Sequence, residues 1–285
     1  ALTVSNVSAS NKTYDGTTTA SMDGTSAVYS GLVNGDTFDG TYTGAFSDKN
    51  AGVGKTVTIT SSYSGADVSN YSVTDQSSTT ANITAKSLTV SGITASDKIY
   101  DGSTSSTLTG TAVYSGLVSG DIFTGSYTGV FANANVGTGK TVNITPSYSG
   151  ADVSNYSVTD QSSTTADISA KALTATASAS NKTYDGGTTA STTLTFTGLV
   201  GSETLGQTVG STFDNKNVGS NKTVTVNSIT LANGSNGGLA ANYSISAGQT
   251  TTANITPKSL TVSGNTASNK VYDSNSSATV SVTLS

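Results

Sequence analysis

The sequence predicts an all-β protein made of tandem small antiparallel β-sandwich domains of immunoglobulin-like type, arranged as an elongated rod. Apolar and polar residues alternate over short segments, as they do in half-buried strands, for example at residues 2–4, 55–60, 71–74 and 81–84. Thr, Val, Ile and Tyr favour strands, and Gly-Asp, Asp-Gly and Asn-Gly pairs favour turns. No segment has a capped helical period. We therefore expect about seven short strands in each domain, as in an immunoglobulin-like sandwich.

A long internal repeat organises the chain. Its most visible segment is Lys-x-Tyr-Asp, with tyrosines at Tyr14, Tyr100, Tyr184 and Tyr272, so that successive copies are 84 to 88 residues apart. Residues 62–81 are identical to residues 147–166. This period exceeds the roughly 20 to 50 residues of a solenoid unit, so each copy is expected to have its own core. The predicted domains are residues 1–85, 86–170, 171–257 and the opening part of a fourth copy, 258–285.

The joins between copies are short. The last predicted strand of one copy is followed by the first strand of the next after about three residues, as in ANITAKSLTV at residues 81–90, with no Gly-Ser hinge. A strand rises about 3.3 Å per residue, so each domain should add roughly 30 to 40 Å to a rod.

Composition excludes several classes of function. The chain has no Cys, His or Trp and a single Glu, so catalytic Ser-His-Asp or Cys-His groups and His or Cys zinc sites have no residues to use. Oxygen ligands remain, and these favour calcium. A net charge of −5 and singly spaced lysines provide no basic stripe for nucleic acid. No apolar run approaches the roughly 18 residues of a membrane span. We therefore expect neither an enzyme, nor a nucleic-acid partner, nor membrane insertion.

Five segments occur in a fixed order: NKTYDGTTTA, GLVNGD, FSDKNAGVGKTVTI, SGADVSNYSV and ANITAKSLTV. Together they resemble the YDG and related MBG repeats of large bacterial surface adhesins of the filamentous-haemagglutinin type, and the resemblance covers the whole chain. It implies a secreted, non-enzymatic stalk or adhesin repeat at the bacterial cell surface, contributing to adhesion and biofilm contacts. The third copy departs from the pattern with GLVGSETLG and LANGSNGGLAANYS, and the fourth has Ser274 in place of glycine.

The recurring Lys-x-Tyr-Asp segment is interpreted as structural. The tyrosine ring is expected to pack against the core with its hydroxyl on a partner, the aspartate to close a turn, and the glycine that follows to adopt a conformation barred to other residues. A carbohydrate site with the tyrosine as platform is the alternative. The residues concerned are Lys12, Tyr14, Asp15, Lys98, Tyr100, Asp101, Lys182, Tyr184, Asp185, Lys270, Tyr272 and Asp273.

Two further hypotheses concern recurring side chains. An intramolecular isopeptide bond needs a lysine, an Asn or Asp, and a nearby acid such as Asp36, Asp121 or Glu203. Alternation argues against it, because Asn82 points to solvent if Ile83 points inward. The pairs are Lys12 with Asn82, Lys98 with Asp167, and Lys182 with Asn254. Calcium, as the one cofactor considered, has weak candidate ligands in Asp36, Asp39 and Asp121.

Three functions remain open from the sequence. The chain is expected to be a stalk or spacer segment of an adhesin, whose partners are the neighbouring repeats of the same chain. One alternative is a filament subunit, in which the incomplete fourth copy is completed by strands of another copy of itself. The other is a carbohydrate-binding module for cell-surface glycans.

Overall fold

The computed structural model describes residues 1–285, which form two compact units. The first unit comprises residues 1–98, 104–133 and 138–167, and the second comprises residues 99–103, 134–137 and 168–285. Strands dominate, and the only helical elements are three short 3-10 turns. None of these helical elements has the length and hydropathy of a membrane-spanning helix. The prediction of a tandem all-β protein is confirmed.

The first repeat folds as two sheets and a short ribbon. The sheets have the strand orders β6-β1-β9 and β3-β10-β8-β7-β4, and β2 pairs with β5. Ten strands are present, more than the seven expected, because the opening segment is divided into several short pieces. The elements are β1 (Leu2–Ser5), β2 (Ser8–Ala9), β3 (Lys12–Thr13), β4 (Thr19–Ala20), β5 (Met22–Asp23), β6 (Val28–Ser30), β7 (Asp39–Phe46), β8 (Gly52–Ser64), η1 (Val68–Asn70), β9 (Val73–Thr74) and β10 (Ser78–Thr84).

The opening segment crosses from one sheet to the other, which corrects the purely antiparallel prediction. β1 runs parallel to β9 in the first sheet, whereas β3 runs parallel to β10 in the second. Between them Asn6 has a φ of 67°, in the left-handed region that breaks a strand. Because the opening segment lies beside the last strand of each sheet in the same direction, both sheets are mixed.

The core of the first repeat lies between its two sheets. Leu2 and Val4 alternate with exposed residues along β1 and are 0% and 2% exposed. They pack in one cluster with Phe38 and with Ile59 of β8, which belongs to the opposite sheet. This is the period-two burial of a sandwich strand.

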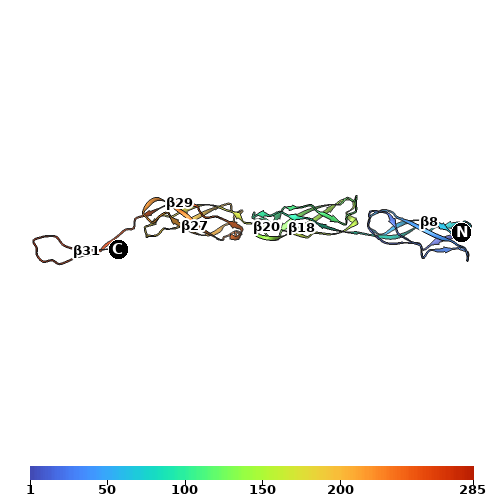
Figure 1. Cartoon of the computed structure of the whole chain (residues 1–285), viewed down its shortest axis with the longest axis horizontal. Coiled ribbons are helices and arrows are strands. Elements are labelled where there is room, and N and C mark those ends of the chain that lie inside the picture. Colours follow the sequence, from blue (N-terminus) through green and yellow to red (C-terminus); the bar gives the residue numbers. More distant parts are fainter. The chain divides into compact units, whose positions relative to one another are not determined.

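The second repeat has the same sheet orders, β16-β11-β19 and β13-β20-β18-β17-β14, with a ribbon of β12 and β15. Figure 1 shows its long neighbouring strands β18 and β20. The elements are β11 (Lys86–Ser91), β12 (Thr94–Ala95), β13 (Lys98–Ile99), β14 (Ser105–Ser106), β15 (Leu108–Thr109), β16 (Val113–Ser115), β17 (Thr124–Phe131), β18 (Gly137–Ser149), η2 (Val153–Asn155), β19 (Tyr156–Thr159) and β20 (Ser163–Ser169).

The third repeat differs at its start. Its segment before the motif tyrosine is one residue shorter, and no left-handed residue corresponds to Asn6 or Gly92. An unbroken strand therefore pairs with β25 from Thr174 to Ala179. The elements are β21 (Lys171–Ala172), β22 (Thr174–Ala179), β23 (Lys182–Thr183), β24 (Thr189–Ala190), β25 (Thr192–Thr197), β26 (Leu205–Phe213), β27 (Gly219–Asn233), η3 (Ala240–Asn242), β28 (Tyr243–Ser244) and β29 (Thr250–Thr256).

The last residues form a hairpin of β30 (Val262–Ala267) and β31 (Val280–Leu284) whose residues are all exposed. Leu260 is 65% exposed and lies outside the strand, although its counterpart Leu88 is fully buried in β11. In the second repeat β11 pairs with β16 on one side and with β19 on the other, whereas β30 pairs only with β31. The earlier joins are shorter than the three or so residues expected, since only Ala85 separates β10 from β11 and only Ala170 separates β20 from β21.

Candidate functional site

The Lys-x-Tyr-Asp segment closes a turn on itself. The Nζ of Lys12 lies 2.7 Å from Asp15 Oδ1 and 2.8 Å from the carbonyl oxygen of Thr17, and the same Asp15 oxygen accepts the Thr17 backbone N–H at 2.9 Å. Burial opposes ionisation, but the hydrogen bonds from Lys12 and Thr17 outweigh it and lower the pKa of Asp15 to about 2. Gly16 has a φ of +79°, which an L-residue adopts only with strain.

The tyrosine of this segment reaches into the next repeat. Tyr14 is 1% exposed, and its hydroxyl donates to Asp121 Oδ2 at 2.8 Å. The hydroxyl of Tyr156 donates to the same oxygen at 2.6 Å. The two rings meet edge to face with centroids 5.6 Å apart. Burial, followed by the hydrogen bond to Asp121, raises the pKa of both tyrosines, that of Tyr156 to about 12.

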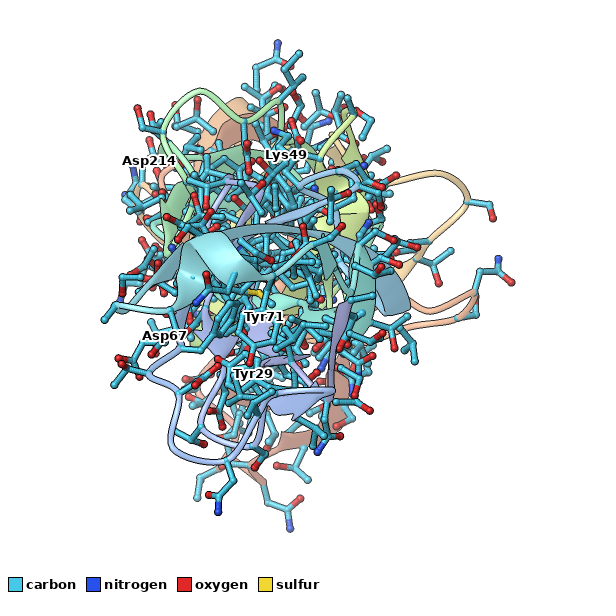
Figure 2. The ribbon with its side chains drawn as sticks, turned by 90° about the vertical axis from the view of Figure 1, so that its right-hand side faces the viewer. Tyr29, Lys49, Asp67, Tyr71 and Asp214 are labelled. Carbon is cyan, nitrogen blue, oxygen red and sulfur yellow. The ribbon has the colours of Figure 1, made fainter.

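A lysine completes the charge balance of this junction. Lys49, labelled in Figure 2, places its Nζ 3.1 Å from Asp121 Oδ1 and 3.0 Å from Asp152 Oδ1. The Asp121 side chain is only 2% exposed. Desolvation opposes its charge, but hydrogen bonds from Tyr156, Tyr14 and Lys49 prevail and lower the pKa of Asp121. The hydrogen bond from the Ile122 backbone N–H, followed by that from Lys49, lowers the pKa of Asp152.

A buried asparagine and a valine finish the junction. Asn155 is 0% exposed, its Oδ1 accepts the Ala51 backbone N–H at 2.9 Å, and its Nδ2 donates to Asn50 at 3.3 Å. A Cβ on Gly16 would lie 2.9 Å from a methyl group of Val118. The residues that the first repeat contributes to this junction are called the tyrosine face: Tyr14, Gly16, Lys49, Asn50 and Ala51. The residues that the second repeat contributes are called the acid face: Val118, Asp121, Asp152, Asn155 and Tyr156.

The corresponding residues of the second unit make the same contacts. The hydroxyls of Tyr100 and Tyr243 donate to Glu203 Oε1 and Oε2, both at 2.7 Å, and their ring centroids are 5.4 Å apart. Asn242 accepts the Val136 backbone N–H at 2.9 Å. Burial, followed by the hydrogen bond to Glu203, raises the pKa of Tyr100 to about 12. A tyrosine pair bridged by one carboxylate is therefore used at both junctions.

The charged pair next to the tyrosines differs between the two junctions. The position of Lys49 is occupied by Ala134 in the second repeat. The position of Asp152, just before the short 3-10 turn, is occupied by Leu239 in the third repeat. The second junction therefore lacks both the lysine and the aspartate that faces it, and neither charge is left unpaired there.

The isopeptide candidates have other partners. The amine of Lys12 is bound within its own turn, whereas Asn82 Oδ1 accepts the Gly54 backbone N–H at 2.7 Å. The same arrangement recurs, with Lys98 and Lys182 donating to carbonyl oxygens of Ser105 and Gly187, and with Asp167 and Asn254 accepting from Gly139 and Asn221. In each repeat the lysine and the amide or acid therefore form hydrogen bonds with other partners.

The remaining predicted residues are distributed as follows. Tyr184 is half-buried, and Tyr272 is 89% exposed. Asp185 and Asp273 pair with the lysines of their own turns, Lys182 and Lys270, each at 2.8 Å. Asp101 accepts the Ser103 backbone N–H at 2.8 Å.

The calcium candidates are not gathered into a cation site. Asp121 already faces the lysine amine, Asp36 accepts the hydroxyl of Tyr71, and Asp39 is exposed at the start of β7. No group of three or more acidic side chains placed to hold a metal ion occurs in the structure.

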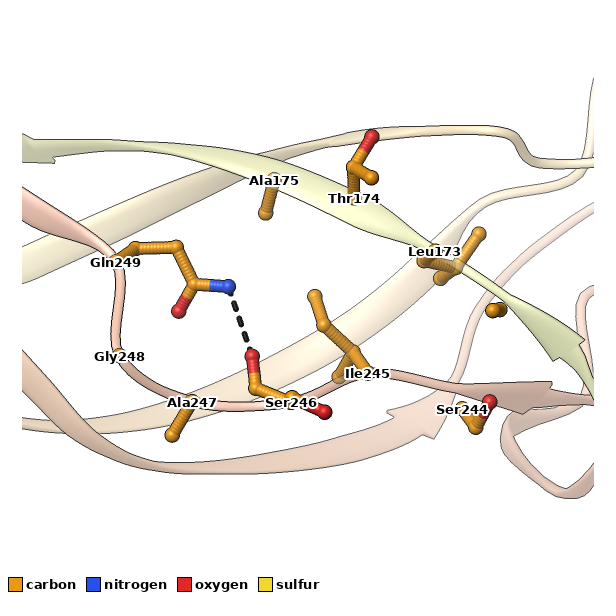
Figure 3. Close-up of a pocket in the computed structure, with 10 residues that line it drawn as sticks. Leu173, Thr174, Ala175, Ser244, Ile245, Ser246, Ala247, Gly248 and Gln249 are labelled. Atoms are coloured by element: carbon orange, nitrogen blue, oxygen red, sulfur yellow. Dashed lines mark hydrogen bonds between the residues drawn. The ribbon is translucent and has the colours of Figure 1, made fainter.

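A shallow hollow of about 500 Å³ lies in the third repeat (Figure 3). It is lined by residues 172–175 and 244–249, which include neither an aromatic nor an acidic side chain. Gln249 Nε2 donates to the Ser246 carbonyl oxygen across it at 2.8 Å. The hollow therefore offers neither a stacking platform for a sugar nor a pair of carboxylates.

Sequence reasoning missed the junction itself. It noted the recurring acid at Asp36, Asp121 and Glu203 but did not assign it to an interface. It did not single out Lys49 or Asp152. At the second junction these two residues are replaced together, by Ala134 and Leu239. This joint replacement is the feature of the sequence that indicates that they face each other.

Comparison with known proteins identifies the repeated unit. The YDG domain matches residues 1–81, 84–166 and 169–253. No curated protein matches the chain. Among solved structures, the chain resembles the I9–I11 tandem of titin with 10% identity and a TM-score of 0.22, covering 89% of this chain and 100% of that one. Since the YDG domain accounts for most of its length, the chain belongs to the YDG domain family, with three copies in tandem.

Proposed function

We propose that this chain is a stalk segment of a secreted bacterial surface adhesin, in which YDG repeats act as stiff spacers and contribute to adhesion and biofilm contacts. The observation that carries the proposal is the repeated junction. The motif tyrosine of one copy and the tyrosine that follows the 3-10 turn of the next copy share one carboxylate, at Asp121 and again at Glu203.

The chemistry of the junction suits a spacer. A one-residue join leaves little freedom at Ala85, and the buried tyrosine pair adds directional hydrogen bonds to a charged acceptor. The same side chains that make the family motif recognisable are used to hold one repeat against the next. Their chemical groups are therefore occupied by each other, which favours a structural role over catalysis.

Small-angle X-ray scattering of the full chain tests the spacer role. Each repeat should add roughly 30 to 40 Å, so the expected maximum dimension exceeds about 100 Å for three repeats. Asp121→Ala should broaden the distribution of interatomic distances, because one junction loses its shared acceptor. A compact particle, or a scattering curve that the variant does not change, would contradict the proposal.

Surface display requires a separate measurement. An antibody raised against the chain should label intact cells of the source bacterium without permeabilisation, and external protease should remove the label. Labelling that appears only after permeabilisation would contradict the assignment to the cell surface.

A further inference from the structure

A second hollow, of about 460 Å³, lies in the second repeat and contains none of the junction residues. It is lined by Tyr114 and Tyr127, by the apolar residues Ile93 and Leu108, and by the loop of residues 109–112. Pockets that bind small molecules typically have volumes of about 300 to 1,000 Å³. The hollow is therefore large enough for a ligand of one or two rings, and its tyrosines are not those of the Lys-x-Tyr-Asp segment.

The two tyrosines of the hollow hold each other in place. The oxygen of Tyr114 accepts the hydroxyl of Tyr127 at 3.2 Å and the backbone N–H of Gly125 at 2.9 Å. The ring of Tyr127 packs edge to face on that of Tyr148, with centroids 6.2 Å apart. Neither hydrogen bond uses the proton of Tyr114, which is therefore left to donate to the oxygen of a ligand.

The hollow has no charged group. Its lining residues include neither an acidic nor a basic side chain, and Thr109, Thr111 and Ser126 bring hydroxyls to it. Burial, followed by the hydrogen bond to Tyr114, raises the pKa of Tyr127 to about 12, so this tyrosine is neutral at pH 7. Aromatic rings and hydroxyls without a counter-ion suit an uncharged ligand that has an apolar ring face and hydroxyl groups, which is the chemistry of a neutral sugar.

The first repeat has the same tyrosine but covers it. Tyr42 corresponds to Tyr127, and the loop next to it is one residue longer than in the second repeat. A Cβ on Gly24 would lie 2.6 Å from two ring carbons of Tyr42, so the backbone of this loop lies directly against the ring. The loop is fastened by Asn6, whose Nδ2 donates to the carbonyl oxygen of Ser26 at 3.1 Å.

The second repeat lacks the groups that fasten this loop. It has no counterpart of Ser26, and Gly92 stands in place of Asn6. A Cβ on Gly110, the counterpart of Gly24, would first meet the carbonyl oxygen of Gly92, at 2.4 Å, and not a tyrosine ring. The shortened loop is therefore turned toward Gly92, and the ring of Tyr127 lines the hollow.

The third repeat has neither the tyrosines nor room beside them. Phe196 and Val209 occupy the positions of Tyr114 and Tyr127. Gln207 occupies the position of Gly125, and its side-chain amide accepts the backbone N–H of Leu194 at 3.0 Å and donates to the Leu194 carbonyl oxygen at 2.7 Å. Only the second repeat combines the two tyrosines with the shortened loop.

We propose that the second repeat binds a neutral sugar, with one sugar ring stacked on Tyr127 and a sugar oxygen accepting the hydroxyl proton of Tyr114. The site gives the chain a binding activity in addition to the spacer function and does not rest on that function. A glycan at this position would be held by one repeat alone. Uronic acids and other charged sugars are excluded as ligands, because the hollow provides no basic group to pair with a carboxylate.

Saturation-transfer difference NMR on the full chain tests the proposal. The probes are neutral disaccharides built from glucose, galactose, mannose and their N-acetylated amino forms, together with digalacturonic acid as the charged comparison. At least one neutral disaccharide should receive saturation, most strongly at the protons on one face of one ring, with a dissociation constant of about 1 mM. Absence of transfer to every neutral disaccharide, or transfer to digalacturonic acid alone, would overturn the proposal.

Two matched variants locate the site. Tyr127→Ala removes the stacking ring and should weaken sugar binding by about tenfold. Tyr42→Ala makes the same change in the first repeat, where Gly24 covers the ring, and should leave binding unchanged. Equal losses in the two variants, or no loss in Tyr127→Ala, would contradict the assignment of the site. Circular dichroism verifies that each variant is folded.

A third variant closes the hollow and keeps both of its tyrosines. It combines Gly92→Asn and Thr109→Asp with a serine inserted after Thr111, which gives the loop of the second repeat the residues of the first. Sugar binding should fall below detection, even if Tyr127→Ala disturbs the packing on Tyr148. Binding that survives the longer loop overturns the proposal. Saturation transfer to an oligoproline peptide in place of the sugars would identify the hollow as a peptide groove and would overturn it as well.

Discussion

Replacement of Asp121 by alanine isolates the energetic contribution of a junction. The carboxylate accepts hydroxyl hydrogen bonds from Tyr14 at 2.8 Å and from Tyr156 at 2.6 Å, and its side chain is 2% exposed. Alanine leaves both buried hydroxyls and the amine of Lys49 without this acceptor. The core of the repeat that carries Asp121 is built from apolar side chains such as Leu88, Val90 and Ile144, which the substitution leaves in place.

The magnitude follows from the two tyrosine contacts. A hydrogen bond to a charged group contributes about 1.5 kcal/mol or more, so two of them amount to about 3 kcal/mol. The half-exposed lysine is left out of this sum because solvent screens it. A loss of about 3 kcal/mol in the free energy of local opening corresponds to exchange faster by a factor on the order of one hundred.

Native-state hydrogen exchange, followed by mass spectrometry on the full chain, measures this opening. The informative peptides cover residues 10–18 and 118–123, on the two sides of the junction. Asp36→Ala is the matched control, since Asp36 occupies the same position but accepts only from the tyrosine of its own repeat, Tyr71. If Asp121→Ala accelerates exchange no more than Asp36→Ala does, the shared carboxylate does not hold the repeats together.

Three further outcomes are expected. The pKa of Asp121 is lower in the folded chain than its ordinary 3.8, so the ionised carboxylate stabilises the folded state fully above pH 3.8. This stabilisation disappears as the pH falls through the folded pKa, and the urea midpoint of unfolding should therefore drop in acid. Asp121→Asn should make the urea midpoint depend less on pH. Gly16→Ala should lower the thermal midpoint of unfolding more than Gly186→Ala does. Either alanine costs about 1 kcal/mol of left-handed backbone strain, but only the Cβ at position 16 would also lie 2.9 Å from a methyl group of Val118. Equal midpoints for the two variants would contradict this expectation. The intact mass should equal that of the unmodified sequence, and a loss of ammonia or water would reveal an isopeptide bond after all.

Much of the fold could be predicted from the sequence because period-two alternation is a local signal. It identified the strand at residues 81–84, which lies within β10, and the strand at residues 55–60, which lies within β8. Parallel pairing could not be predicted, because it depends on which strand lies beside the opening segment in three dimensions. The third repeat keeps both parallel pairings, of β21 with β28 and of β23 with β29, although its opening segment is one residue shorter.

The junction was harder to predict than the motif. The spacing of Tyr14 from Gly16 indicates a turn, and the turn was correctly expected to need a glycine. The partner of the tyrosine hydroxyl lies 107 residues away in the chain, so no local pattern indicates it. Lys49 lies 72 residues from Asp121, and it was not singled out because an isolated lysine in a loop is usually solvated.

The replacement of Lys49 by Ala134 and of Asp152 by Leu239 makes the order of the repeats matter. If recombination joined the first repeat directly to the third, Lys49 would face Leu239 and lose one of its two carboxylates. Duplication of residues 62–81 as 147–166 copied the aspartate position unchanged, as Asp67 and Asp152. Unequal crossing-over that adds or removes a repeat is therefore tolerated best where a repeat with the lysine precedes a repeat with the aspartate. The residues at the two ends of a repeat thus restrict which repeat can follow it.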